Sequence, residues 1–390
     1  MKKTISTAKT TTVRTRNFKI KTRTTTTTTE VIVEEEPMAP AVDEPIEPTP
    51  AVEVKEEPVE PTPAVEAVTA KLFYEVMPER YGWGEFTLGG GTGKFEKVVT
   101  SSELLDALRD PNVFRIDVAA DINLNDAELT TSSNKTVISS NGSILRNLRW
   151  RIKAENILLM NLFLTESKDD LITLDGARNI YIKNCTFDSQ FGLPYIKHPK
   201  TPNLGATEEE VKEALKQWAT MDRTGWEQNV IDGQIDIINS KNVTIDSCLF
   251  ANHDKVSLVR SGTDNLSIIN TVYRNTFQRG PQSTGKVHFA NNVYEDVKYG
   301  MRSIEEGNYL AEGNMFFRTE RINRNSTSHP TAYGQIRNSF TEDCKAFDQP
   351  LEPPLSLLWE PYQFYNFEVK TPSKELAAQI IKNAGQVLHL

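Results

Sequence analysis

The chain has 390 residues, a formal net charge of −9 and an isoelectric point of about 5.3. This length suits two or three average domains, or one long repetitive domain with a tail, and the acidity argues against nucleic acid as the main partner. The sequence contains no run of about 20 apolar residues, so it predicts no membrane-spanning helix.

Residues 1–37 form a basic, threonine-rich segment with an unbroken threonine run at 24–29. Residues 1–29 carry eight Lys or Arg and no acidic residue. No apolar core follows Lys2 and Lys3, so a standard signal peptide is not expected. Two interpretations stay open: a disordered chain, or β-structure that forms on assembly with a partner. In either case the segment is a candidate anchor.

Residues 38–70 have the composition of an acidic, proline-rich linker. The decapeptides EPIEPTPAVE (44–53) and EPVEPTPAVE (57–66) are near copies thirteen residues apart. Proline at this density blocks helices and sheet ladders and favours an extended, solvated chain. We therefore expect a semi-rigid spacer that its own negative charge extends.

The composition becomes globular at residue 71 and stays so to residue 390. A short amphipathic helix is predicted over 101–110, with Leu104, Leu105 and Leu108 on one face and Ser101 or Ser102 as its cap. Residues 114–118 then have the pattern of a strand. No signal for a second globular domain follows.

Short apolar runs recur along the rest of the chain, about twenty-two residues apart where no insert intervenes. This spacing is typical of a solenoid in which each coil gives short strands to parallel sheets, and the gaps are too short for the helices of a doubly wound α/β fold. Asparagines accompany the runs and are interpreted as stacked ladders, with ordinary loop positions as the alternative. The runs cover 135–139, 156–164, 179–187, 242–250, 265–272, 286–294 and 308–316; the asparagines are Asn161, Asn184, Asn270, Asn292 and Asn314.

A long insertion interrupts the repeat at about 193–229. Within it, residues 208–221 have helical spacing. Insertions in solenoids usually lie on one face, which is often the binding face. The helix either shapes a substrate site or shields an apolar patch.

Several motifs, in order, resemble the pectate lyase superfamily of the family-one type. They are YGWG (81–84), TLGG (87–90), DGQIDI (232–237), NVTI (242–245), HDK (253–255), RGP (279–281), GKVH (285–288), and the closing segment through Ala384 and Gly385. The resemblance implies an all-β fold, a right-handed parallel β-helix with a low-complexity N-terminal extension. It also implies an acidic polysaccharide such as pectate as the substrate.

The resemblance further implies calcium as the cofactor, held by Asp232 and Asp236. Calcium prefers hard oxygen ligands and stabilises charge that develops on a uronate carboxylate. A third acid is needed, and Asp188 is the nearest candidate. The alternative is that His198, Pro199 and Lys200 occupy that place and that Lys200 or Lys197 supplies the charge instead.

By the same resemblance, Lys255 pairs with a substrate carboxylate and Arg279 is the general base, or else clamps the carboxylate. Two positions depart from the family. Thr284 stands where the family has a second arginine, and Lys286 is expected to reach the groove and compensate in part. Lys183 and Asn184 replace an Asp-His pair. His253 and His288 are expected to be structural.

The leading prediction is a calcium-assisted polysaccharide lyase that cleaves a uronate-containing chain by β-elimination. The alternative is a non-catalytic glycan-binding or structural β-helix, such as a phage virion component that the N-terminal segment tethers. Either way, the expected location is extracellular or virion-associated.

Overall fold

The computed structural model describes residues 10–15, 18–25, 28–35, 80–167, 169–188, 232–260, 262–324 and 328–386. The linker expected over 38–70, residues 71–79 and the helical insertion expected over 193–229 lie outside these described residues. The chain divides into two compact units, Met1–Thr62 and Pro63–Leu390.

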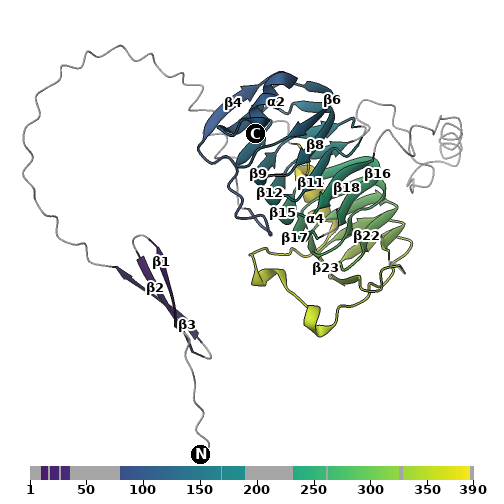
Figure 1. Ribbon diagram of the computed structural model, residues 1–390. Helices are drawn as coiled ribbons and strands as arrows, with labels where there is room; N and C mark the ends of the chain where they lie inside the picture. Colours follow the sequence, from purple (N-terminus) through teal and green to yellow (C-terminus); the bar gives the residue numbers. More distant parts are fainter. Residues whose placement is uncertain are drawn as a thin grey trace, which may run out of the picture. The chain divides into compact units, whose positions relative to one another are not determined.

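The first unit contains a three-stranded antiparallel sheet within the threonine-rich segment. The strand order is β1-β2-β3, and the Thr24↔Thr29 and Thr25↔Thr28 pairs lie at one end of the β2–β3 ladder. Threonine suits such strands because its branched side chain favours the extended backbone. The strands are β1 (Thr10–Thr15), β2 (Phe18–Thr25) and β3 (Thr28–Glu35) (Figure 1).

The second unit is a right-handed parallel β-helix, as the repeat spacing and the resemblance predicted. One wall is a ten-stranded sheet in which every pair of neighbours is parallel. Its strands, in spatial order, are β4 (Lys94–Val98), β5 (Val113–Val118), β7 (Lys135–Ile138), β9 (Glu155–Met160), β12 (Arg178–Lys183), β15 (Lys241–Asp246), β17 (Asp264–Ile269), β20 (Lys286–Ala290), β23 (Asn308–Glu312) and β26 (Tyr333–Arg337).

A fourteen-stranded sheet forms the other walls as two rows of strands, and β6, β8 and β16 run through both rows. The first row, called the site row below, is β6 (Ile122–Thr130), β8 (Ile144–Ile152), β11 (Ile172–Asp175), β14 (Gly233–Ile238), β16 (Leu249–Arg260), β19 (Gln282–Ser283), β22 (Tyr299–Ser303) and β25 (Arg321–Asn323). The second row adds β10 (Phe163–Thr165), β13 (Thr186–Asp188), β18 (Val272–Gln278), β21 (Val293–Val297), β24 (Met315–Phe317) and β27 (Phe340–Glu342).

The interior of the β-helix is a continuous apolar core with an aromatic stack. Five rings from five coils stack with centroids 4.6 to 5.3 Å apart. This spacing is close to the distance of about 4.8 Å between neighbouring strands, so each ring lies on the ring of the coil before it. The five residues are Phe187, Phe250, Tyr273, Tyr294 and Phe316.

Most of the predicted apolar runs contain two strands and the corner between them. At the corner, Asn161, Asn184 and Asn270 have φ values of 50° to 53°, a left-handed backbone that asparagine tolerates. Further along, Asn291 and Gly313 take the left-handed position. There the predicted Asn292 and Asn314 point inward instead: Nδ2 of Asn292 donates to the Ile268 carbonyl at 2.8 Å, and Asn314 Oδ1 accepts from Asn292 N at 2.9 Å. The ladder interpretation is therefore confirmed for Asn292 and Asn314, whereas Nδ2 of Asn161 and Nδ2 of Asn184 donate to the backbone carbonyls of Ser139 and Asn383.

Among its described residues, the second unit also contains two helices and two short 3-10 turns. Helix α2 (Ser101–Arg109) buries Leu104 and Leu108, as predicted, but its cap is Thr100, which forms a reciprocal capping box with Glu103. The predicted caps Ser101 and Ser102 lie inside the first turn. Helix α4 (Lys374–Asn383) starts after Ser373, and the turns are η1 (Leu355–Leu357) and η2 (Pro361–Gln363). Among the described residues, no helix is both long and apolar enough to cross a membrane.

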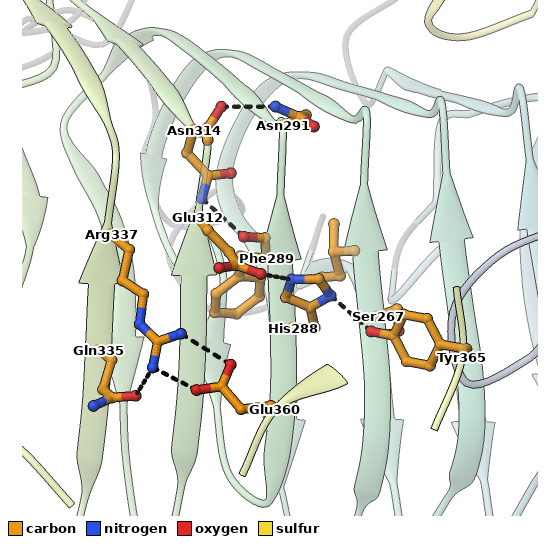
Figure 2. Close-up of polar contacts among 12 residues, drawn as sticks. Ser267, His288, Phe289, Asn291, Glu312, Asn314, Gln335, Arg337, Glu360 and Tyr365 are labelled. Carbon is orange, nitrogen blue, oxygen red and sulfur yellow. Dashed lines mark hydrogen bonds and ion pairs between the residues drawn. The ribbon is translucent and has the colours of Figure 1, made fainter. Parts of the chain in front are cut away.

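Two segments from the ends of this unit cover the outer face of the ten-stranded sheet. Trp83 lies 4.4 Å from Phe364, centroid to centroid, and its backbone N–H donates to Ser267 Oγ at 3.2 Å. Ser267 Oγ in turn bonds the Tyr365 hydroxyl, which lies 2.7 Å from His288 Nδ1 (Figure 2). Nε2 of His288 lies 3.0 Å from Glu312 Oε1. His288 is thus structural, as expected.

Candidate active site

A cluster of carboxylates lies where two neighbouring strands of the site row begin. Asp169 and Asp170 precede β11, and Asp232 precedes β14. The two strands are parallel, with Thr173 opposite Asp236, so residues more than sixty positions apart meet. Each of Asp169, Asp170 and Asp232 has an oxygen within 4.8 Å of the others.

Gly233 leaves the space that lets Asp170 and Asp236 approach each other. A Cβ at Gly233 would lie 2.5 Å from Asp170 Oδ1 and 3.2 Å from Asp236 Oδ1. The Gly233 N–H donates to Asp170 Oδ1 at 2.8 Å, and the Thr173 hydroxyl bonds Asp170 Oδ2 at 3.3 Å. The glycine therefore brings two strands and two carboxylates together.

The negative charge of these carboxylates is only partly balanced by positively charged side chains of the protein. Burial, with a further contribution from neighbouring carboxylates, raises the pKa of Asp170 to about 6 and that of Asp236 to about 7. Asp236 Oδ1 is buried and has no hydrogen-bond partner among the described residues. A hard divalent cation fits this oxygen-only donor set, because it supplies both the missing charge and the missing partner.

Two residues of β16 fix Asp232 in place. Lys255 is in register with Gly233, and its Nζ donates to Asp232 Oδ1 at 2.8 Å. This hydrogen bond holds the pKa of Asp232 below its usual range. Burial lowers the pKa of His253 to about 4, so its ring is neutral at pH 7 and its Nε2–H can donate to the Asp232 carbonyl at 3.0 Å.

Arg279 follows β18 and has a left-handed backbone, with φ of 58°. Its carbonyl accepts from Ser257 N at 2.8 Å, which ties this corner to β16. The positive charge of Arg279 acts to lower the pKa of both Asp232 and Asp236. Four of the predicted site residues, Asp232, Asp236, Lys255 and Arg279, are therefore neighbours.

Lys286 is not brought to this cluster. It opens β20 in the ten-stranded sheet, where its Nζ lies 3.9 Å from Asp264 Oδ2. The prediction assumed that Thr284 and Lys286 share one strand and one face. In the structure Gly285, with φ of 68°, turns the chain from one sheet into the other between them. Thr284 itself is buried, and its N–H donates to the Val259 carbonyl.

Asp188 also lies elsewhere. It ends β13, in the second row, opposite Ala251, and it accepts from Asn252 Nδ2 at 2.9 Å. The acids that adjoin Asp232 are Asp169 and Asp170, which sequence reasoning did not select. The available signal was a pair of aspartates directly before an apolar run, one coil ahead of Asp232. The alternative at 198–200 lies outside the described residues.

The replaced Asp-His pair lies on the other sheet. Lys183, in β12, forms a buried ion pair with Asp246, which also accepts from the Tyr181 hydroxyl at 3.0 Å. Asn184 donates to the Asn383 carbonyl at 2.8 Å at the end of α4. Both residues therefore hold structural elements together, and their departure from the motif does not alter the carboxylate cluster.

A family model described as "Pectate lyase" matches residues 90–343. Solved structures with the same fold include an arginine-to-lysine variant of Bacillus subtilis pectate lyase, with TM-score 0.61, 14% identity, and coverage of 80% of this chain and 97% of that one. A pectate lyase bound to a hexasaccharide has TM-score 0.62, 15% identity and coverage of 80% and 98%. The cedar pollen allergen jun a 1 has TM-score 0.58, 18% identity and coverage of 79% and 93%. Among curated proteins no sequence matches.

Proposed function

The chain belongs to the pectate lyase family, and from this premise we propose that it cleaves a uronate-containing polysaccharide, such as polygalacturonate, by calcium-assisted β-elimination. One observation carries the proposal. Asp170, Asp232 and Asp236 lie together on adjacent strands, beside the cations Lys255 and Arg279. Acids for a metal and cations for a uronate are thus combined in one place.

Asp170, Asp232 and Asp236 are the residues that would hold calcium, with Asp170 in the role that was expected of Asp188. The buried, unpartnered Oδ1 of Asp236 and the raised pKa values of Asp170 and Asp236 support this assignment. When bound, calcium supplies positive charge to the uronate carboxylate, which stabilises the charge that develops as the adjacent C5 proton leaves.

Two basic side chains of the protein do the remaining work at the sugar. We place Arg279, in its uncharged guanidine form, at the C5 proton, which it accepts to become a guanidinium as the electrons of the C5–H bond form the C4–C5 double bond. The bond from C4 to the glycosidic oxygen breaks, and that oxygen leaves with its electron pair and is protonated from solvent. Lys255 is placed at the uronate carboxylate, where its ammonium group stabilises negative charge. His253 keeps Asp232 in position through the backbone.

Glycan binding without turnover is the second candidate function. It is favoured by Thr284, a buried neutral residue at the position where the family motif has a second arginine. Loss of a bidentate carboxylate clamp weakens the binding of a fully de-esterified chain. It also leaves the reacting sugar less firmly oriented. A binder would retain polygalacturonate and release no shortened product.

Uronate polysaccharides lie outside cells, so we place the protein's activity there, free or on a virion surface. The basic segment 1–37 and the acidic linker 38–70 would tether the β-helix to an assembly partner. Particle association that survives deletion of residues 1–62 would contradict this tether.

Mass spectrometry of polygalacturonate digests tests the reaction type. β-Elimination leaves one fragment of each pair lighter by one water than hydrolysis does, with a double bond at its new end. Unsaturated fragments that require calcium support the proposal. Saturated fragments alone would identify a hydrolase, and intact polymer that is retained by the protein would identify a binder.

A further inference from the structure

The register of the three-stranded sheet in the first unit sorts its residues onto two faces. Val13 is opposite Ile20, and Ile20 is opposite Val33, so these three residues form one row across the sheet. Residues directly opposite each other share a face, and successive residues of a strand lie on opposite faces. The face of this row, called the apolar face below, holds five of the six apolar residues of the strands: Val13, Phe18, Ile20, Val31 and Val33.

The opposite face, called the charged face below, has the reverse composition. Lys19 is opposite Glu34 and Arg23 is opposite Glu30, and opposite charges at such positions stabilise a sheet. This alternation is typical of an antiparallel sheet that has one face in water and the other face covered. The charged face holds six of the seven charged residues of the strands: Arg14, Lys19, Lys21, Arg23, Glu30 and Glu34.

The unit is small for a sheet with such an apolar face. Its strands have six, eight and eight residues, and they are the described residues of this unit. A sheet with one apolar face is stable when that face packs on another layer. A folded unit of fewer than about 40 residues usually needs a disulfide, a metal or oligomerisation. The described part of the unit contains no cysteine, so oligomerisation fits it best.

The two edges of the sheet are complementary in charge. β1 and β3 are the edge strands, and β2 lies between them. β1 carries one cation, Arg14, and no acid, whereas β3 carries three glutamates and no cation. An edge strand presents unpaired backbone N–H and C=O groups to any strand that lies beside it. The β1 edge of one chain therefore suits the β3 edge of a second copy of the same chain.

We propose that the N-terminal sheet is an assembly surface at which copies of this chain associate. The β1 edge of one copy lies beside the β3 edge of the next, and the apolar faces turn inward against each other. Such a head-to-tail contact forms a ring when its rotation closes, and a closed ring leaves no free edge. The assembly itself does not depend on the proposed lyase function. Only its consequence does: several β-helix units would meet one polysaccharide chain and retain it more firmly.

Sedimentation equilibrium of the full chain tests the assembly, because one chain has a mass of 44.0 kDa. Wild type is expected to form an oligomer at micromolar concentration, and the protein without residues 1–62 is expected to be a monomer. A wild-type chain that is monomeric throughout the measured range, or an oligomer that survives the deletion, would overturn the proposal. The lyase assay is independent of both results.

Two neighbouring substitutions test which face is covered. Val33→Asp places an acid on the apolar face and should raise the dissociation constant of the oligomer by about a hundredfold or more. The matched control Ile32→Asp places the same acid on the charged face, opposite Lys21, and should leave the constant nearly unchanged. Equal effects of the two substitutions would overturn the assignment of the face.

Arg14→Glu separates loss of association from loss of the sheet. Within one copy, Arg14 is opposite Lys19, so the substitution replaces a pair of like charges by a favourable pair and should strengthen the sheet itself. Beside the acidic β3 edge of a second copy, the new acid is repelled, and the dissociation constant should rise about tenfold. An unchanged constant would overturn the contact between edges. Thermal melts verify that the β-helix unit is folded in every variant.

Discussion

At the scale of single residues, Asp170 and Asp236 show how the fold would prepare the proposed cation site. Two carboxylates that water would keep fully charged are held in a partly buried place, beside each other and on either side of Gly233. The protein without a cation therefore carries an electrostatic cost there. A divalent cation that binds these oxygens removes the cost, so cation binding and stability are coupled.

The first prediction concerns Asp236→Asn. Because the folded-state pKa of Asp236 is raised to about 7, its stabilising contribution is complete below the unfolded value near 3.8 and is lost as the pH rises through about 7. Without calcium, the variant is expected to match wild type near pH 4 and to exceed it near pH 8, by on the order of 1–3 kcal/mol in the free energy of unfolding. Chemical denaturation in EDTA at the two pH values measures this.

Calcium should reverse the order of stability of the two proteins, so that wild type becomes more stable than Asp236→Asn. At pH 8 with excess calcium, wild type gains stability and the variant, which has lost one charged ligand, gains less. His253 and His288 also titrate differently in the folded protein, but they are the same in both proteins and cancel in the difference. A wild-type protein that is the more stable one at pH 8 without calcium would contradict the assignment.

At the scale of elements, two segments from the ends of the β-helix unit cover the outer face of the ten-stranded sheet. A chain of contacts joins both ends of the β-helix unit to one surface: the Trp83 N–H bonds Ser267, and Figure 2 shows its continuation through Tyr365 and His288 to Glu312. Burial lowers the pKa of His288, which favours a neutral ring whose Nδ1 accepts a hydrogen bond from the Tyr365 hydroxyl and whose Nε2–H donates a hydrogen bond to Glu312. We therefore assign this network a role in stabilising the fold and no role in the chemistry of the carboxylate cluster.

The second prediction follows from this network. Tyr365→Phe removes a hydroxyl that bonds Ser267 and His288, both of them buried, and should cost about 1–3 kcal/mol of unfolding free energy. The matched control is Tyr362→Phe, because Tyr362 is 68% exposed, and it should change stability very little. Denaturant unfolding of the three proteins, with lyase assays on the folded samples, would measure both effects. Equal losses from the two substitutions would show that the network does not stabilise the fold.

The same scale shows what the sequence could and could not predict. The coils were predictable because apolar runs and asparagines recur at a local, regular spacing. The sheet face on which Lys286 lies could not be predicted, because Gly285 turns the chain from one sheet into the other and breaks the alternation of side chains. Asp170 was missed because its neighbour Asp232 comes 62 residues later in the sequence. Neither local pattern determines the register between their two strands. The grouping of Asp232, Asp236, Lys255 and Arg279 was predictable because their motifs follow one another in the order of the family.

At the scale of the whole molecule, the β-helix unit has its own continuous core and lies within Pro63–Leu390. The third prediction is that deletion of residues 1–62 leaves the melting temperature of this unit, and its activity on polygalacturonate, within error of the full chain. Calorimetry and a lyase assay on both forms measure this. A truncated protein that melts several degrees lower would mean that the N-terminal unit supports the fold.

The central claim is that the carboxylate cluster and its two cations form the active site of a lyase. The most direct test follows the near-ultraviolet absorbance of unsaturated uronide released from polygalacturonate, with calcium or with EDTA, for wild type, Arg279→Ala and Arg109→Ala. We expect product from wild type and Arg109→Ala in calcium, none in EDTA, and a loss of at least about a hundredfold in kcat for Arg279→Ala. No product from folded wild-type protein in calcium, or full activity in Arg279→Ala, would contradict the account.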